Sequence, residues 1–175
     1  MTQQITQEAK KAYDKKDYQH AAEGYAKAAA LSLQTGDELQ AAEMQNNASV
    51  AWLQAGKAQL ALDAALGSDM VFYNAGDRQR QALALGNQAA ALEELGRFIE
   101  ALDKYQQSAD LLKELGENDM RTYVLQRLAG VQLRTGDQFQ SLASMHIALE
   151  NKKKLSLKER FLQKLLRIPF RMPRK

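Results

Sequence analysis

Few residues of this chain have the types and spacing that catalysis requires. The sequence has no cysteine and only two histidines, His20 and His146, with no acid or nucleophile at a spacing that would complete a catalytic set. The neighbouring carboxylates of Glu93 and Glu94 would diverge by about 100° on a helix, so they cannot share a proton. The glycines stand singly and form no loop that could hold a phosphate. We therefore expect no enzyme, no metal site and no cofactor.

The 175 residues suffice for about one globular domain and are rich in alanine (28) and glutamine (19), which favour helices. Residues 1–150 carry 14 basic and 20 acidic side chains, whereas residues 151–175 carry ten basic side chains and one acid, Glu159. An acidic body with a basic end indicates two different partners, or one part that binds the other. The sequence has no apolar run long enough for a membrane span and no secretory signal, so we expect a cytoplasmic protein, with peripheral membrane attachment as an alternative.

Glycines mark a repeat of 40 residues. Gly36, Gly76 and Gly116 are 40 residues apart, and each precedes an acid. Gly56, Gly96 and Gly136 have the same spacing, half a period later, and Lys16 takes the first place of that series. Because glycine commonly follows a helix end and aspartate suits a helix start, this pattern predicts eight helices of roughly 16–18 residues joined by tight turns.

Side chains between the glycines repeat in the same register. The segments DYQHAAEGYAKAAAL, GKAQLALDAALGS, GRFIEALDKYQQSADLL and GDQFQSLASMHIAL resemble the second helix of a tetratricopeptide repeat, and NNASVAWLQAG and GNQAAALEELG resemble its first helix. The family's usual period is about 34 residues, with a proline between repeats, so this chain resembles a long-helix variant. The resemblance implies an all-α, right-handed solenoid of four helical hairpins, at about 2–36, 37–76, 77–116 and 117–150, with a C-terminal capping helix in the basic segment 151–175.

The resemblance also implies a concave groove, lined by the first helix of each repeat, that binds a peptide or helix of another protein. The family position that is commonly asparagine holds Gln7, Asn47, Asn87 and Arg127, whose side chains suit the backbone of an extended peptide. One turn further, the shrinking series Lys10, Val50, Ala90 and Gly130 would deepen the groove. An alternative is that the amides only satisfy neighbouring helix ends. We expect a non-enzymatic scaffold or adaptor whose partner-binding residues are Asn47, Asn87, Arg127, Glu43, Arg80, Tyr123 and Arg134.

The basic segment predicts one more helix. Ser156 and Glu159 form an S-x-x-E capping box that starts this helix near Leu157, and Pro169 should end it. The helix would be amphipathic, and three interpretations stay open: a cap on the last repeat, a helix that docks on an anionic membrane, or an arm that binds the acidic body or a second copy of the chain. The pattern does not favour nucleic acid, because no aromatic stacking platform accompanies the cations. The candidate docking residues are Lys158, Arg160, Phe161, Lys164, Leu165 and Arg167.

Overall fold

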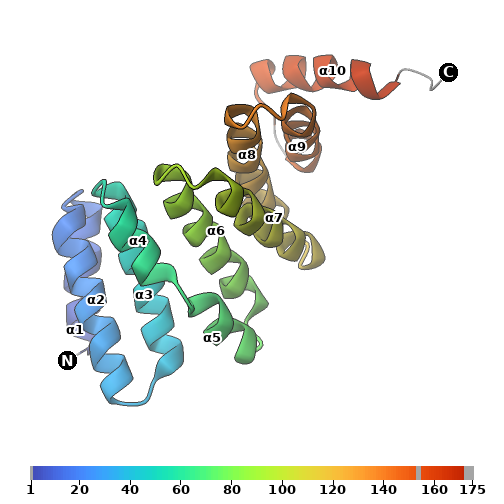
Figure 1. Cartoon of the computed structure of the whole chain (residues 1–175). Helices are drawn as coiled ribbons and strands as arrows, with labels where there is room; N and C mark the ends of the chain where they lie inside the picture. Colours follow the sequence, from blue (N-terminus) through green and yellow to red (C-terminus); the bar gives the residue numbers. More distant parts are fainter. Residues whose placement is uncertain (1, 153–154, 172–175) are drawn as a thin grey trace.

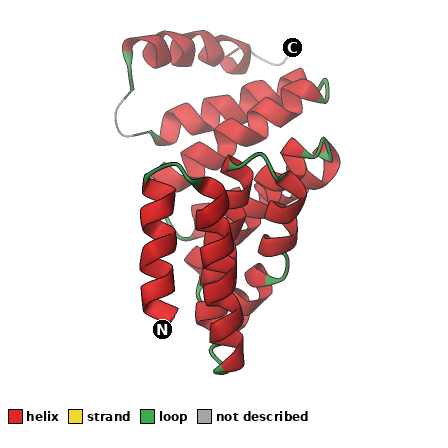
Figure 2. Cartoon of the chain, turned by 90° about the vertical axis from the view of Figure 1, so that its left-hand side faces the viewer, coloured by secondary structure: helices red, strands yellow, loops and turns green. Residues whose placement is uncertain are grey.

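A computed structural model describes residues 2–152 and 155–171, and in this part of the chain all regular structure is helical (Figure 2). The helices follow one another as a stack of antiparallel hairpins, and α10 lies across the C-terminal end (Figure 1). Their bounds are α1 Thr2–Asp14, α2 Tyr18–Gln34, α3 Glu38–Gln54, α4 Ala58–Ala65, α5 Ser68–Asn74, α6 Arg78–Glu94, α7 Phe98–Glu114, α8 Asn118–Arg134, α9 Gln138–Asn151 and α10 Leu157–Arg171.

The 40-residue pattern of glycines places the helix ends. After α2, the Asp37 N–H donates to the Ser32 carbonyl at 2.9 Å, and the Gly36 N–H donates to the Leu33 carbonyl at 3.1 Å. This pair of bonds is a Schellman motif, which requires a left-handed residue, and Gly36 has a φ of 76°. The predicted glycines at the other turns have positive φ as well. In the first turn Lys16 takes this conformation, with a φ of 63°, although a side chain disfavours it.

Aspartates start three of the helices. The side chains of Asp37, Asp77 and Asp137 each accept a hydrogen bond from the backbone N–H three residues later, at 3.0, 2.9 and 3.1 Å. This is the N-cap geometry that the Gly-Asp pairs predict. Each turn therefore ends one helix and starts the next within three residues.

The stretch between Gly56 and Gly76 differs from the prediction. One continuous helix is expected there, but the chain forms α4 and α5, so that residues 2–151 hold nine helices rather than eight. Leu66 has an extended backbone and Gly67 has a φ of 82°, which together interrupt the helix. The carbonyl of Ala65, which the break leaves without its helical partner, accepts from Ser68 Oγ at 2.7 Å and from buried Gln88 Nε2 at 3.0 Å. These bonds stabilise the interruption.

Alanines form much of the core between the helices. Those at 21, 61 and 101, one per period, are completely buried, and small side chains of this kind allow the helices to approach closely. Tyr105 and Phe72 are among the largest side chains of the core, and both are almost fully buried. The helix pairs with substantial contact are neighbours in the chain or at most three helices apart, which is the arrangement of a solenoid.

The last helix begins as predicted. Ser156 N–H donates to the Glu159 carboxylate at 2.8 Å and Glu159 N–H donates to Ser156 Oγ at 3.3 Å, so the capping box is confirmed. The predicted end at Pro169 is wrong, because α10 continues to Arg171. Proline has a φ suited to a helix and here comes in the last turn, where its missing N–H removes a single helical bond.

Candidate functional site

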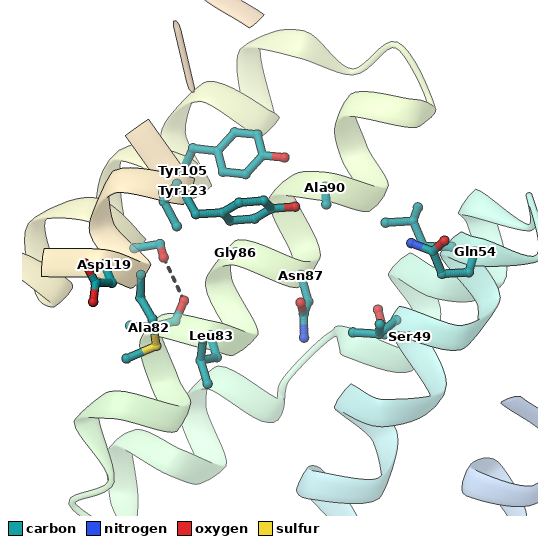
Figure 3. A pocket seen from close by; sticks show the side chains of 15 residues that line it. Ser49, Gln54, Ala82, Leu83, Gly86, Asn87, Ala90, Tyr105, Asp119 and Tyr123 are labelled. Atoms are coloured by element: carbon teal, nitrogen blue, oxygen red, sulfur yellow. Dashed lines mark hydrogen bonds between the residues drawn. The ribbon is translucent and has the colours of Figure 1, made fainter. Parts of the chain in front are cut away.

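An apolar pocket of about 450 Å³ lies between α3, α6 and α8. Its floor belongs to α6 and α7, and its two walls belong to α3 and α8 (Figure 3). Most of the lining is aliphatic or aromatic, with a few polar groups at its margin. The lining residues are Ser49, Val50, Leu53, Gln54, Ala82, Leu83, Gly86, Asn87, Ala90, Tyr105, Ser108, Asp119, Met120, Tyr123 and Val124.

Small residues of α6 give the pocket its depth. Gly86 has no side chain, and a Cβ added there would meet only Ser108 Oγ, at 3.5 Å. Ser108 donates its hydroxyl to the Ala82 carbonyl at 2.8 Å, so this polar group of the floor is already satisfied (Figure 3). Ala90, one turn further, also contributes only a methyl group. The centre of the pocket therefore presents apolar surface without competing hydrogen-bonding groups.

Two of the predicted partner-binding residues, Asn87 and Tyr123, line this pocket, as do Val50 and Ala90 of the series that is predicted to deepen the groove. Asn87 lies on its α6 side, where its amide donates to Asn46 Oδ1 of α3 at 3.1 Å. Tyr123 is exposed on the α8 wall. Asn47 is half-buried on α3 and lies outside the residues that line the pocket.

Glu43 and Arg80 form an ion pair that joins α3 to α6. Arg80 Nη1 donates to Glu43 Oε2 at 2.9 Å, and Arg80 Nε donates to Asp77 Oδ2 at 2.6 Å. The Arg80 backbone N–H, followed by its guanidinium, holds the pKa of Asp77 below its ordinary value. The guanidinium of Arg80 is thus shared between two acids and is already positioned before any partner arrives.

Arg127 and Arg134 of α8 both contact the same buried carboxylate. The Glu93 side chain is only 4 % exposed, and its distances to Arg127 Nη2 and Arg134 Nη1 are 2.7 and 3.2 Å. Tyr105 OH also donates to Glu93, at 2.9 Å, and burial raises the pKa of this phenol above its ordinary value. We call Glu93, Tyr105, Arg127 and Arg134 the Glu93 cluster. It connects α6 and α7 with α8.

Several residues of the site could not be identified from the sequence. Gly86 gave a usable signal, because a glycine inside a helical pattern and away from the 40-residue grid indicates a packing or functional need. Met120 and Asp119 gave no such signal, since they follow no repeated register in the sequence. In the sequence Glu93 stands out only as half of an acidic pair, because its burial depends on how α8 packs.

The predicted docking residues of the C-terminal segment lie on α10. Lys158, Arg160, Phe161, Lys164 and Leu165 are exposed, and the side chain of Arg167 lies outside the described residues. Within residues 2–152 and 155–171, no helix is long and apolar enough to cross a membrane. In the same range, no group of acids and histidines is arranged to hold a metal ion.

Comparison with protein families and with curated proteins finds no match to this sequence. Comparison of the fold does find similar solved structures. They include the nearly identical TPR-like repeats of a Podosopora anserina protein assigned as a kinesin light chain, with a TM-score of 0.54, and a single-residue variant of the same repeats, with a TM-score of 0.55. Each is 13 % identical and covers 94 % of this chain and 92 % of its own. The fold is therefore a tetratricopeptide-like solenoid.

Proposed function

We propose that this protein is a non-enzymatic scaffold that binds a peptide or helix of a partner protein in its concave groove. The observation that carries the proposal is the apolar pocket between α3, α6 and α8. Its volume of about 450 Å³ lies within the range of roughly 300–1,000 Å³ that is typical of specific binding pockets. The pocket would receive apolar side chains of the partner segment. We also propose that the protein acts in the cytoplasm.

Preorganisation supports this function. The pocket is bordered by three helices whose positions are fixed by the Glu43–Arg80 pair on one side and by the Glu93 cluster on the other. A rigid groove loses little conformational entropy when a partner binds. Asn87 and Gln54, at the margin, would supply donors and acceptors for the backbone of the bound segment. We also propose that the other predicted groove residues, including Asn47, contact the partner segment on either side of the pocket.

Filling the pocket tests the proposal. Gly86→Leu places a side chain in the pocket, whereas the control Ala30→Leu introduces a leucine at an exposed position of α2, outside the residues that line the pocket. Both proteins are immobilised beside the native chain and used to capture partners from a native lysate. A protein bound by the native chain and by Ala30→Leu should be bound at least tenfold more weakly by Gly86→Leu. Equal capture by all three would refute the pocket as the binding site.

The captured partner then identifies the segment. A photoreactive amino acid in place of Leu83, which lies on the rim of the pocket, should crosslink to one short stretch of the partner that is rich in apolar residues. A synthetic peptide of that stretch should bind the native chain and compete with the full partner. Crosslinks scattered over the partner's whole surface would contradict binding of a defined segment.

A second candidate function is recruitment to a membrane through the basic C-terminal helix. The observation that favours it is the exposure of apolar and basic side chains on α10, away from the groove. The two functions use different residues and are compatible in one molecule.

A further inference from the structure

The outer face of α10 has an apolar ridge with cations on both sides. Leu157, Phe161 and Leu165 are 83 %, 66 % and 46 % exposed, and at four-residue spacing they lie within about 80° of one another on the helix. Lys158 lies on one side of this ridge, and Arg160 and Lys164 lie on the other; all three cations are exposed. We call Leu157, Phe161 and Leu165 the α10 ridge.

The opposite face of α10 attaches it to the stack. Leu166 is only 5 % exposed, and Gln163 Nε2 donates to the Leu149 carbonyl of α9 at 3.3 Å. Lys152, just after α9, pairs with Glu159 at 2.7 Å. The residues that contact the body are therefore separate from the α10 ridge. The helix covers the end of the solenoid with one face and leaves its ridge uncovered.

Charge indicates what covers the ridge. Glu159 is the one acid among residues 151–175, and it is already engaged by Lys152 and by the capping box. The positive charge of Lys158, Arg160 and Lys164 thus surrounds an apolar strip, whereas residues 1–150 carry an excess of acids. An anionic lipid surface complements both features, because phosphates attract the cations and the acyl boundary accepts the apolar side chains.

From these observations we propose that the α10 ridge docks on anionic membrane surfaces while α10 stays attached to α9. The helix lies in the plane of the interface, with Phe161 and its two leucine neighbours inserted and the flanking cations at the headgroups. The acidic body is repelled by the same surface, which orients the stack away from the lipid. The pocket lies among α3, α6 and α8, so docking through α10 leaves the groove open to a partner.

Cosedimentation of the full chain with vesicles tests the proposal. We expect binding to phosphatidylcholine vesicles that contain about one third phosphatidylglycerol, weak binding to pure phosphatidylcholine, and release by high salt. Changing Lys158, Arg160 and Lys164 together to glutamine should reduce the partition coefficient roughly a hundredfold. The matched control, glutamine at the exposed body lysines Lys27, Lys57 and Lys113, removes the same charge and should not weaken binding.

The apolar contribution is tested separately. Phe161→Ala should weaken binding to the anionic vesicles roughly tenfold, whereas Phe139→Ala, an equal change at an exposed phenylalanine of α9, should not. Circular dichroism verifies that each variant is folded. Equal losses for the α10 and body variants, or equal binding to both lipids, would overturn the proposal. So would a molar mass that rises with concentration and depends on Phe161, because a second copy of the chain would then cover the ridge.

Discussion

The Glu93 cluster yields a quantitative prediction for Arg127. Removing one partner of a fully buried ion pair costs about 3–5 kcal/mol. Here the Arg127 side chain is 34 % exposed and Arg134 still reaches Glu93 at 3.2 Å, which lessens the loss. We therefore expect Arg127→Leu to lower the free energy of unfolding by about 2 kcal/mol. Combining it with Glu93→Leu should cost less than the sum of the two changes, by about 1–2 kcal/mol.

Urea unfolding, followed in two ways, measures this effect. Far-UV circular dichroism reports on all helices, whereas the fluorescence of Trp52, the only tryptophan, reports on α3 in the first half of the stack. Since the Glu93 cluster joins α6 and α7 to α8, Arg127→Leu should shift the dichroism transition more than the fluorescence transition. The control is Arg97→Leu, which breaks an exposed pair with Glu100 and should leave both transitions unchanged.

A coupling energy near zero would refute this account of the Glu93 cluster. Arg127 would then be available to a partner, as the sequence analysis predicts for it. Weaker partner capture by Arg127→Leu, with both unfolding transitions unchanged, would support that binding role directly.

Three further predictions concern the first turn, the glycines of α6 and α8, and the C-terminal helix α10. Lys16→Gly should raise the free energy of unfolding by about 1 kcal/mol in urea titration, because glycine tolerates the positive φ. A lower free energy of unfolding would refute this prediction. Gly86→Ala in α6 and Gly130→Ala in α8 should each raise the free energy of unfolding by about 0.5–1 kcal/mol, because alanine favours a helix and neither new Cβ meets a close contact. A lower free energy of unfolding for Gly86→Ala would show that the floor of the pocket has no room for the added methyl group. The Lys152 side chain, followed by the capping bonds, lowers the pKa of Glu159 to about 2 from its ordinary 4.5. Because the pKa of Glu159 is lower in the folded protein, its carboxylate stabilises α10 fully above about pH 4.5, and this stabilisation is lost as the pH falls toward 2. Amide hydrogen exchange in α10 should therefore become faster, relative to the rest of the chain, over this pH range. Glu159→Gln should abolish that pH dependence.

The repeat was readable from the sequence because its signals are local. A Gly-Asp pair contains both the left-handed residue that ends one helix and the side chain that caps the next, so Gly36 and Asp37 identify their turn without knowledge of the rest. The capping box at Ser156 is local in the same way. For these features, spacing and residue type were sufficient.

The features that the sequence analysis missed depend on distant contacts. The break at Gly67 is stabilised by Gln88 from α6, 21 residues later in the chain, although the glycine outside the grid gave a partial signal. The position of Arg127 in its register indicated the groove, but its pairing with Glu93 required α8 to be packed on α6 and α7. The pocket likewise combines residues of four helices, so its depth at Gly86 could be recognised only in three dimensions.

The nearest-neighbour contacts of the stack have a consequence for folding while the chain is being synthesised. Each hairpin packs against its neighbours in the stack, and among the described residues no substantial contact joins helices more than three apart. During synthesis, each new hairpin can therefore pack on the hairpin before it without waiting for distant parts of the chain. At any moment the nascent chain leaves only the apolar side of the most recent hairpin open to aggregation. The basic helix α10 follows the groove helices in the chain, so the ridge that we propose for lipid becomes available after the groove has formed.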